Sequence, residues 1–303
     1  MKMKSGEIIR NLRKELGMSQ EVLAEKLSIT PHQVSRMERS KTPPDIWYIM
    51  QMLELLGRPS EDFWMMYLGT NDYDGYLIYR NLRKSLRDND GVNARKHLKQ
   101  LEESAVCEKP FVRQAIAWAR VRLNESLSGE EAIEEFYKVL RMSNPSFNED
   151  KLDEQRLYYQ EIWTLVSIAS RSNKIGDREK AIYITESLLR NRENFKTSED
   201  DKAIILPTLF FNLSNYYGKS DKIKDSLRTA EKGLVVCQEN NNFRLIPELM
   251  LNIATSHRLM GEEERKYKPY LVRAYHCALG MGRGEIAAFI KKDAEDNFGI
   301  KEL

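Results

Sequence analysis

The chain lacks any apolar run that could cross a membrane. Its longest apolar stretch, residues 204–211, is interrupted by Pro207 and is far shorter than a bilayer span. The basic residues 1–4 are not followed by an apolar segment, so the start of the chain does not resemble a signal peptide. These absences predict a cytoplasmic protein that makes no membrane contact.

Cysteine and histidine are also scarce. The three cysteines, Cys107, Cys237 and Cys277, are odd in number and widely spaced, which indicates free thiols in a reducing compartment, and we expect them to be small buried apolar residues. The four histidines show no metal-ligand spacing, and no serine or cysteine lies in a nucleophile motif. We therefore expect no metal, no cofactor and no enzyme activity.

A net excess of positive or negative charge is nearly absent as well. The 48 Lys and Arg residues almost balance 46 Asp and Glu residues, and residues 1–67 hold ten basic and nine acidic side chains. A DNA-binding protein with so small a net charge needs locally clustered cations. The small net charge also favours a dimer, because two copies double the number of phosphate contacts.

The sequence does contain a helix-turn-helix pattern near its start. We expect a first helix over residues 6–16 that ends at Gly17, and a second helix capped by Ser19. Thr30 precedes a proline and stands three residues before Gln33, which is a strong start signal for a third helix.

Two further helices complete the predicted five-helix bundle, one capped by Asp45 and one by Ser60. The apolar positions recur at helical spacing, so we expect them to form the core of the bundle. These positions are Ile9, Leu12, Leu16, Leu23, Ala24, Leu27, Val34, Met37, Ile46, Ile49, Leu53 and Leu56.

Residues 5–67 resemble the phage-repressor-like (XRE) helix-turn-helix family. The glutamine, alanine and aliphatic residue that this family usually has in helices two and three are Gln20, Ala24 and Val34 here. Ser28 replaces the usual glycine of the turn, and a left-handed serine would carry a strain of about 1–2 kcal/mol. The alternative for this segment is a small helical bundle without a DNA-binding role.

The resemblance also implies an ion pair between Arg13 in the first helix and Glu38 at the end of the third. The outer face of the third helix is polar, and Arg36 on it suits a bidentate contact to guanine. His32 could reach a base edge. Gln33 could do the same, or the capping box at the helix start could engage it instead. The predicted DNA-binding residues, some of them suited to phosphate instead, are Gln20, Thr30, His32, Gln33, Ser35, Arg36, Arg39 and Lys41.

The rest of the chain shows an internal period. Gly176, Gly218 and Gly261 are 42 and 43 residues apart, each near a turn between two amphipathic helical patterns. A period near 40 built from helix pairs indicates a solenoid. We expect pairs at residues 76–104, 110–142, 154–192, 203–237 and 243–280, and a terminal capping helix at 284–298. The predicted organisation is a DNA-binding domain over 1–68, a linker over 69–75 and the solenoid over 76–303.

Residues 209–237 resemble a degenerate tetratricopeptide (TPR) repeat. Its small and apolar packing positions are Leu213, Ser214, Tyr217, Ser226, Ala230 and Gly233, and related positions in earlier pairs are Ala119, Ala132, Phe136, Ile168, Ala169 and Ala181. The resemblance implies an all-α, right-handed solenoid whose concave face is lined by the first helix of each pair. Such a face normally binds an extended peptide.

Asparagine suits that role because its amide both donates to and accepts from a peptide backbone. Asn212 and Asn215 are three residues apart and so share a helix face. The predicted peptide-binding residues are Trp163, Ser167, Ser170, Asn173, Asn212, Asn215 and Asn252. For each of them, an ordinary solvated helix residue is the alternative.

The two parts together resemble the Rgg/PlcR/PrgX-type (RRNPP) quorum-sensing regulators. The resemblance implies a cytoplasmic homodimer, joined through the TPR domain, whose groove binds a short signalling peptide and whose heads bind a double-stranded DNA operator. Peptide changes operator affinity only if it prefers one of two dimer arrangements. Two alternatives stay open: a helix-turn-helix repressor whose array serves only dimerisation or a protein partner, and a peptide adaptor that uses the array alone.

Overall fold

The computed structural model describes residues 5–39, 46–55 and 73–303. It separates into two compact units, residues 1–119 and 120–303, and each is considered by itself. Among the described residues, no helix combines the length and the apolar character that crossing a bilayer requires.

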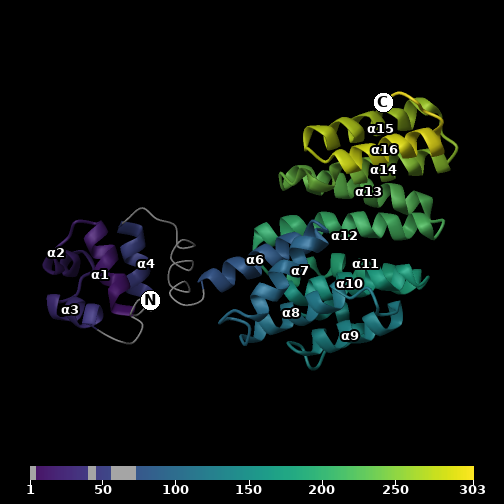
Figure 1. Cartoon of the computed structure of the whole chain (residues 1–303). Coiled ribbons are helices and arrows are strands. Elements are labelled where there is room, and N and C mark those ends of the chain that lie inside the picture. Colours follow the sequence, from purple (N-terminus) through teal and green to yellow (C-terminus); the bar gives the residue numbers. More distant parts are fainter. Residues whose placement is uncertain (1–4, 40–45, 56–72) are drawn as a thin grey trace. The chain divides into compact units, whose positions relative to one another are not determined.

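Helices make up nearly all the regular structure, as the sequence predicts (Figure 1). The first unit contains α1 (Ser5–Glu15), α2 (Gln20–Lys26), α3 (Pro31–Arg39), α4 (Ile46–Leu55), α6 (Tyr73–Arg87), α7 (Gly91–Glu102) and most of α8 (Pro110–Leu123). The second unit continues with α9 (Gly129–Arg141), η2 (Glu149–Glu154), β1 (Leu157–Tyr158), α10 (Tyr159–Lys174), α11 (Arg178–Arg190), η3 (Arg192–Asn194) and β2 (Phe195–Lys196). It ends with α12 (Glu199–Lys219), α13 (Ile223–Glu239), η4 (Phe243–Leu245), α14 (Ile246–Leu259), α15 (Glu264–Gly280) and α16 (Gly284–Phe298).

The first three helices confirm the helix-turn-helix prediction. Their core consists of Ile9, Leu12, Leu23, Ala24, Leu27 and Val34, with Met37 packed against it. Leu16 is only partly buried, whereas Met52 of α4, which the sequence pattern did not indicate, is completely buried. The expected caps Asp45 and Ser60, the fifth helix, and the side chains of Ile46, Ile49, Leu53 and Leu56 lie outside what the structure describes.

Two tight turns position these helices. Gly17 ends the segment after α1 with φ +63°, the left-handed conformation that glycine adopts without a steric penalty. Ser28, between α2 and α3, is also left-handed with φ +53°. The strain expected from serine at this position is therefore present in the fold.

Gly6 allows α1 to cross α3 at close range. A Cβ atom at this position would lie 2.3 Å from the backbone oxygen of Glu38 and 2.7 Å from that of Met37. No side chain fits there, so only glycine permits the crossing. The sequence pattern did not single out Gly6, because its role depends on a helix far along the chain.

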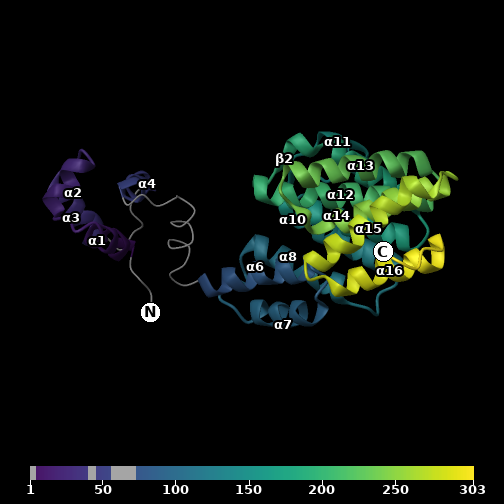
Figure 2. The same ribbon diagram turned by 90° about the horizontal axis from the view of Figure 1, so that it is seen from above.

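The expected helix pairs are all present, and the capping helix occupies the predicted range at α16. The first pair begins a little earlier than expected, because α6 starts at Tyr73, inside the segment 69–75 assigned to a linker. Residues 56–72 lie outside the described part of the chain, so the linker stays a prediction. Figures 1 and 2 show the pairs of the second unit following one another in sequence order.

Within the second unit, each pair packs on the next. The first helices contact one another in succession, α10 with α12, α12 with α14 and α14 with α16, more closely than the second helices do. Because helices on the inside of a curved stack lie closer together, the first helices lie on the inner side of the stack. We call α10, α12 and α14 the inner row.

The small residues predicted for the repeat interface are buried where two helices meet. Ser214 of α12 and Ser226 of α13 are at most 4% exposed, and each hydroxyl donates to the other residue's carbonyl oxygen, at 3.0 and 2.9 Å. A Cβ at Gly233 would lie 2.8 Å from the Cβ of Phe210 and 2.9 Å from Leu249. The helices approach closely here because the residues between them are small.

The three aligned glycines all lie at or near turns between helices, as expected, but they do not share one conformation. Gly176 and Gly261 are left-handed turn residues with φ +94° and +73°. Gly218, however, lies in the last turn of α12, and the left-handed residue of that turn is Asp221, with φ +59°. The structural repeat therefore places Asp221 where the other turns use glycine.

The cysteines are free thiols, as expected, but they differ in burial. Cys237 is completely buried, whereas Cys107 and Cys277 are only partly buried. The prediction of three buried cysteines is thus correct only for Cys237. Burial raises the pKa of the Cys237 thiol to about 11, which keeps it protonated and unreactive near neutral pH.

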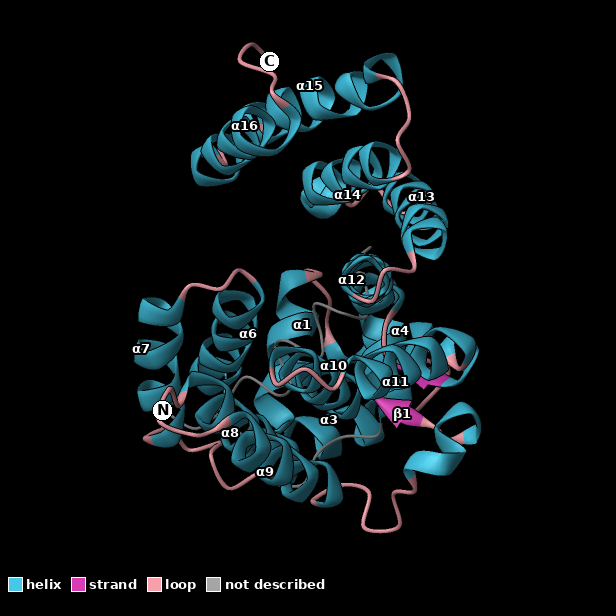
Figure 3. Ribbon diagram, turned by 90° about the vertical axis from the view of Figure 1, so that its right-hand side faces the viewer, coloured by secondary structure: helices cyan, strands magenta, loops and turns pink. Residues whose placement is uncertain are grey.

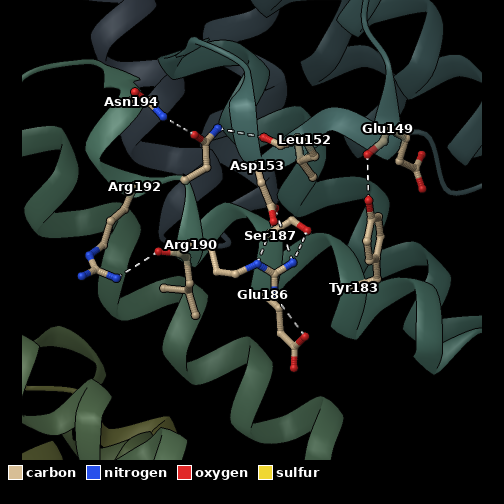
Figure 4. A network of polar contacts seen from close by, with 11 residues as sticks. Glu149, Leu152, Asp153, Tyr183, Glu186, Ser187, Arg190, Arg192 and Asn194 are labelled. Carbon is tan, nitrogen blue, oxygen red and sulfur yellow. Dashed lines mark hydrogen bonds and ion pairs between the residues drawn. The ribbon is translucent and has the colours of Figure 1, made fainter.

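The long connection before α10 is held by polar contacts with α11. Figure 4 shows Arg190 donating to both carboxylate oxygens of Asp153, at 2.8 and 3.4 Å, and to the Ser187 hydroxyl at 2.8 Å. The buried Asn191 donates to the carbonyl oxygens of Leu152 and Gln155, at 2.9 and 2.7 Å.

The two short strands β1 and β2 pair in parallel, with Leu157 opposite Phe195. Figure 3 shows β1 beside α11. Because β1 runs directly into α10, these contacts fix where the inner helix begins.

Ser28→Gly is expected to stabilise the helix-turn-helix domain by about 1 kcal/mol, because glycine adopts the left-handed conformation without strain. The greater conformational entropy of glycine in the unfolded chain offsets part of this gain. Hydrogen exchange of the α2 and α3 amides in the full chain measures the change. Ser19→Gly, at a capping serine with an extended backbone, is the matched control and is expected to destabilise α2 slightly. Faster exchange in Ser28→Gly would contradict the strain argument.

Candidate functional sites

The start of α3 is built as the sequence predicts. The backbone N–H of Thr30 donates to Oε1 of Gln33 at 2.8 Å, and the backbone N–H of Gln33 donates to the Thr30 hydroxyl at 3.2 Å. This reciprocal capping box engages the Gln33 carbonyl oxygen, while its NH₂ group stays available as a donor. Gln33 can therefore hold the helix start and still reach a base acceptor.

An ion pair fixes α3 against the other two helices. Arg13 donates to Glu38 through Nε at 2.5 Å and through Nη2 at 3.3 Å, and its Nη1 donates to the Met18 carbonyl oxygen at 2.7 Å. Only 3% of the Glu38 side chain is exposed. The pairing expected from the family resemblance is therefore present, and Glu38 holds the three helices together.

Gln20 joins the same network. Its amide nitrogen donates to Oε2 of Glu38 at 2.7 Å, which uses one of its two N–H groups. The second N–H can still donate to a phosphate, so the DNA-binding role of Gln20 stays a prediction. Burial opposes ionisation of Glu38, but the hydrogen bonds from Arg13 and Gln20 outweigh it and lower its pKa below the ordinary value of 4.5.

The remaining predicted DNA-binding residues lie on one side of α3. His32, Arg36 and Arg39 are exposed, Thr30 at the helix start is exposed too, and Ser35 is half-buried. Arg39 folds back along the helix, where Nη2 donates to the Ser35 hydroxyl at 2.7 Å. Lys41 lies outside the described residues.

The predicted peptide-binding residues of α10 are more buried than expected. Trp163 and Ser167 are 6% and 7% exposed, and the Ser167 hydroxyl donates to the Trp163 carbonyl oxygen at 2.8 Å. Ser170 and Asn173 are partly exposed. The Ser167 hydroxyl is thus used within its own helix.

The asparagines occupy the next two helices of the inner row. Asn212 and Asn215 on α12 are both partly exposed, as a ligand-binding side chain must be. Asn252 on α14 donates to the Ser214 hydroxyl at 3.3 Å, so part of its amide joins the interface between repeats. The structure therefore places the three asparagines on neighbouring inner helices, and their contact with a peptide stays a prediction.

Several buried polar atoms on α10 have no hydrogen-bond partner. They are both side-chain atoms of Gln160, Nε1 of Trp163, the Ser172 hydroxyl and Oδ1 of Asn173. A buried polar atom without any partner costs about 1–3 kcal/mol, so in a native fold such atoms usually bind another protein group, water or a polar ligand. The sequence pattern did not indicate Gln160, although it stands one helical turn before Trp163.

A cavity of about 830 Å³ lies elsewhere, among α11, α12 and α13, and Phe210, Leu213 and Tyr217 contribute its α12 side. None of the predicted peptide-binding residues lines it. It therefore belongs to the side of the stack where the second helices spread apart. In the described part of the chain, no cluster of His, Cys, Asp and Glu side chains is arranged to hold a metal ion.

The fold and its site define a helix-turn-helix head joined to a solenoid of helix pairs. The helix-turn-helix family profile matches residues 9–63. No curated protein matches the chain in sequence.

Among solved structures, PlcR of Bacillus thuringiensis is similar with a TM-score of 0.77 and 18% identity, over 97% of this chain and 99% of that chain. ComR of S. thermophilus is similar with a TM-score of 0.66 and 17% identity, over 95% of this chain and 98% of that chain. The pheromone receptor Rgg2 of Streptococcus dysgalactiae is similar with a TM-score of 0.63 and 16% identity, over 96% of this chain and 98% of that chain. The chain therefore has the fold of these regulators along nearly its whole length.

Glu38→Gln is expected to destabilise the packing of α1 on α3 by about 1–3 kcal/mol at neutral pH, because the charged partner of Arg13 is lost. A carboxylate whose pKa is lowered by folding stabilises the fold above its unfolded pKa, and that stability disappears as the pH falls through the folded value. The difference between wild type and Glu38→Gln should therefore shrink below pH 4.5. Hydrogen exchange of α1 and α3 measures it.

The control for this prediction is Glu25→Gln, at an exposed position of α2. It should leave exchange unchanged at both pH values. If amide exchange in Glu38→Gln is as slow as in the wild type at neutral pH, the ion pair does not stabilise the packing of α1 on α3.

Arg36→Ala is expected to weaken binding to the preferred DNA duplex by about 1–3 kcal/mol and to relax selectivity at one base pair. The duplex is obtained by selection from a random pool with the full chain, and binding is followed by fluorescence anisotropy. Lys14→Ala, an exposed cation of α1, is the control. Unchanged affinity and selectivity in Arg36→Ala would reject the base contact.

Proposed function

We propose that this protein is a DNA-binding transcriptional regulator controlled by a short signalling peptide that binds along the inner row of its solenoid. The observation that carries the proposal is the set of unpartnered buried polar atoms on α10, in a chain that also presents a polar α3 face. Buried polar atoms of this kind bind water or a polar ligand, and a polar helix face suits a duplex groove.

The similar structures support this proposal through what they contain. The PlcR structure is a complex with the peptide PapR7 and DNA, and the ComR structure is a complex with DNA and its signalling peptide. Both cover nearly all of the present chain, so the same two parts are available here in the same order. By this analogy the protein acts in the cytoplasm as a homodimer joined through the solenoid, and it performs no catalytic step.

The proposed regulation rests on the geometry of a dimer. Two recognition helices read two half-sites only when their separation matches the helical repeat of DNA. A peptide that binds one dimer arrangement more tightly than the other shifts the population toward it, and so changes operator affinity.

Asn212 and Asn215 are the proposed contacts to the peptide backbone, because both are partly exposed on one face of α12. Trp163, Asn173 and Asn252 would extend the same binding surface onto the neighbouring helices.

The test is to select a duplex with the full chain and then screen short synthetic peptides for a change in its binding. A regulator of the proposed kind responds to some peptides with a saturable shift in duplex affinity. If the chain binds a duplex but no peptide alters that binding, the peptide-controlled function is wrong and a repressor with a purely structural array remains.

Asn212→Ala is expected to raise the concentration of an active peptide needed for half the response by about tenfold or more, because the backbone contacts of one amide are lost. Binding to DNA without peptide should not change. The matched control is Gln238→Ala, which removes an exposed amide from α13, the second helix of the same pair. A wild-type peptide response in Asn212→Ala would show that this asparagine is not part of the peptide site.

A further inference from the structure

The inner helix α12 contains a buried proline, Pro207, in its interior. Because proline has no backbone N–H, the carbonyl oxygen of Ala203, four residues earlier, lacks the donor that a helix normally supplies. A main-chain oxygen left without a donor inside a packed interface lowers stability. Pro207 therefore marks a weak point in the helix that carries Asn212 and Asn215.

A second feature weakens the same turn of α12. The Thr208 hydroxyl donates to the carbonyl oxygen of Ile204 at 2.9 Å. A threonine that bonds in this way to the carbonyl four residues earlier slightly destabilises a helix and often bends it. Two consecutive residues, Pro207 and Thr208, thus reduce the ability of α12 to hold this turn by itself, and contacts from outside the helix gain importance.

The donor that Pro207 lacks comes from the next interface of the stack. Asn242, in the turn between α13 and η4, donates its side-chain N–H to the Ala203 carbonyl oxygen at 2.7 Å. This distance is at the short end of the range for an N–H···O bond. The side chain of Asn242 therefore replaces the missing backbone donor, and it joins α12 to the connection that leads into α14.

The turn that carries Asn242 holds this side chain in a defined direction. Asn241 is left-handed with φ +51°, and the backbone N–H of Asn242 donates to the Cys237 carbonyl oxygen at 2.9 Å, which closes the end of α13. The side-chain oxygen of Asn242 accepts the backbone N–H of Arg244 at 3.3 Å and caps η4. One amide thus serves two elements, since its oxygen holds η4 and its nitrogen holds α12.

The next pair holds α12 on both sides of the proline. Before Pro207, the contact is the one between Asn242 and Ala203. After it, the Asn252 amide of α14 donates to the Ser214 hydroxyl at 3.3 Å. The direction in which the partly exposed asparagines of α12 point therefore depends on both contacts, because the helix itself is weak between them.

The geometry points to Asn242 as a positioning residue for the peptide site: it supplies the hydrogen-bond donor that Pro207 lacks and so holds the ligand-facing part of α12 in its binding geometry. Its own amide is engaged by α12 and η4, so it acts through Asn212 and Asn215 and not through a contact of its own with the peptide. This inference rests on the proposed function, because it names a residue that supports the same site.

The experiment is a double-mutant cycle in the full chain. Asn242→Asp keeps an oxygen for the cap of η4 but removes the donor to Ala203, whereas Pro207→Ala restores a backbone N–H within α12. Asn242→Asp is expected to speed amide exchange on both sides of Pro207 by about tenfold, as for a carbonyl that loses its donor. In the Pro207→Ala background the same change is expected to have little effect, because Ala203 then has a donor within the helix.

Asn240→Asp is the matched control, since the amide of Asn240 donates to the Val236 carbonyl oxygen of its own helix. It should leave exchange in α12 unchanged. Pro207→Val also restores the N–H and keeps more buried volume, so it replaces Pro207→Ala if that variant fails to fold. Equal effects of Asn242→Asp in both backgrounds would overturn the inference.

A second readout separates positioning from stability. It uses the synthetic peptide that shifts duplex binding of the wild type most strongly. Asn242→Asp is expected to raise the concentration of this peptide needed for half the response by at least about threefold, and Pro207→Ala is expected to reverse the increase.

Faster exchange in Asn242→Asp together with a wild-type peptide response would overturn the positioning role and leave the proposed function standing. If no peptide shifts duplex binding of the wild type, the proposed function and the positioning role both fail, whereas the exchange cycle still shows whether Asn242 replaces the missing donor.

Discussion

A pair of amphipathic helices cannot bury all of its apolar surface by itself, and most of this chain is built around that constraint. Each pair of the second unit covers the next, so the interface between pairs decides how closely they approach. The buried serines Ser214 and Ser226 and the glycine at 233 let α12, α13 and α14 pack tightly at one such interface. Because the first helices lie closer together than the second helices, the stack presents one continuous row of inner helices, on which ligand-binding residues can be placed.

The helix-turn-helix domain depends on a different device, a buried ion pair. Glu38 ends α3, and its carboxylate is held by Arg13 from α1 and Gln20 from α2, so one side chain connects all three helices. Gly6 brings α1 close enough for this network to form. The result is a small domain in which α3 is fixed by its inward side, while Arg36 and its neighbours remain exposed on the other. A helix held in this way would lose little conformational entropy in the proposed contact with DNA.

The inner helix α10 shows the opposite balance, because it carries features that lower stability. Buried hydrogen-bonding groups without partners oppose folding, and proteins retain such features mainly at functional sites. The well-satisfied polar network around Arg190 and Asn191 provides a contrast on the adjacent helix (Figure 4). There, Arg190 and Asn191 join α11 to the segment before α10 and hold the start of α10 in place. The proposal for peptide binding rests on this difference between satisfied and unsatisfied polar groups within one unit.

Local signals in the sequence determined the helices, their pairing and the identity of the head. Caps, turn glycines and apolar spacing act over a few residues, and they placed the capping helix correctly. The left-handed Ser28 and the pairing of Arg13 with Glu38 were expected from the family resemblance, because the second joins residues that are distant in the chain. The tertiary structure alone decided which polar side chains are engaged, since Ser167 proved to have a partner while Gln160 did not. It also made Gly6 indispensable. These features arise between residues far apart in the chain, where spacing carries no information because distance depends on how the helices pack.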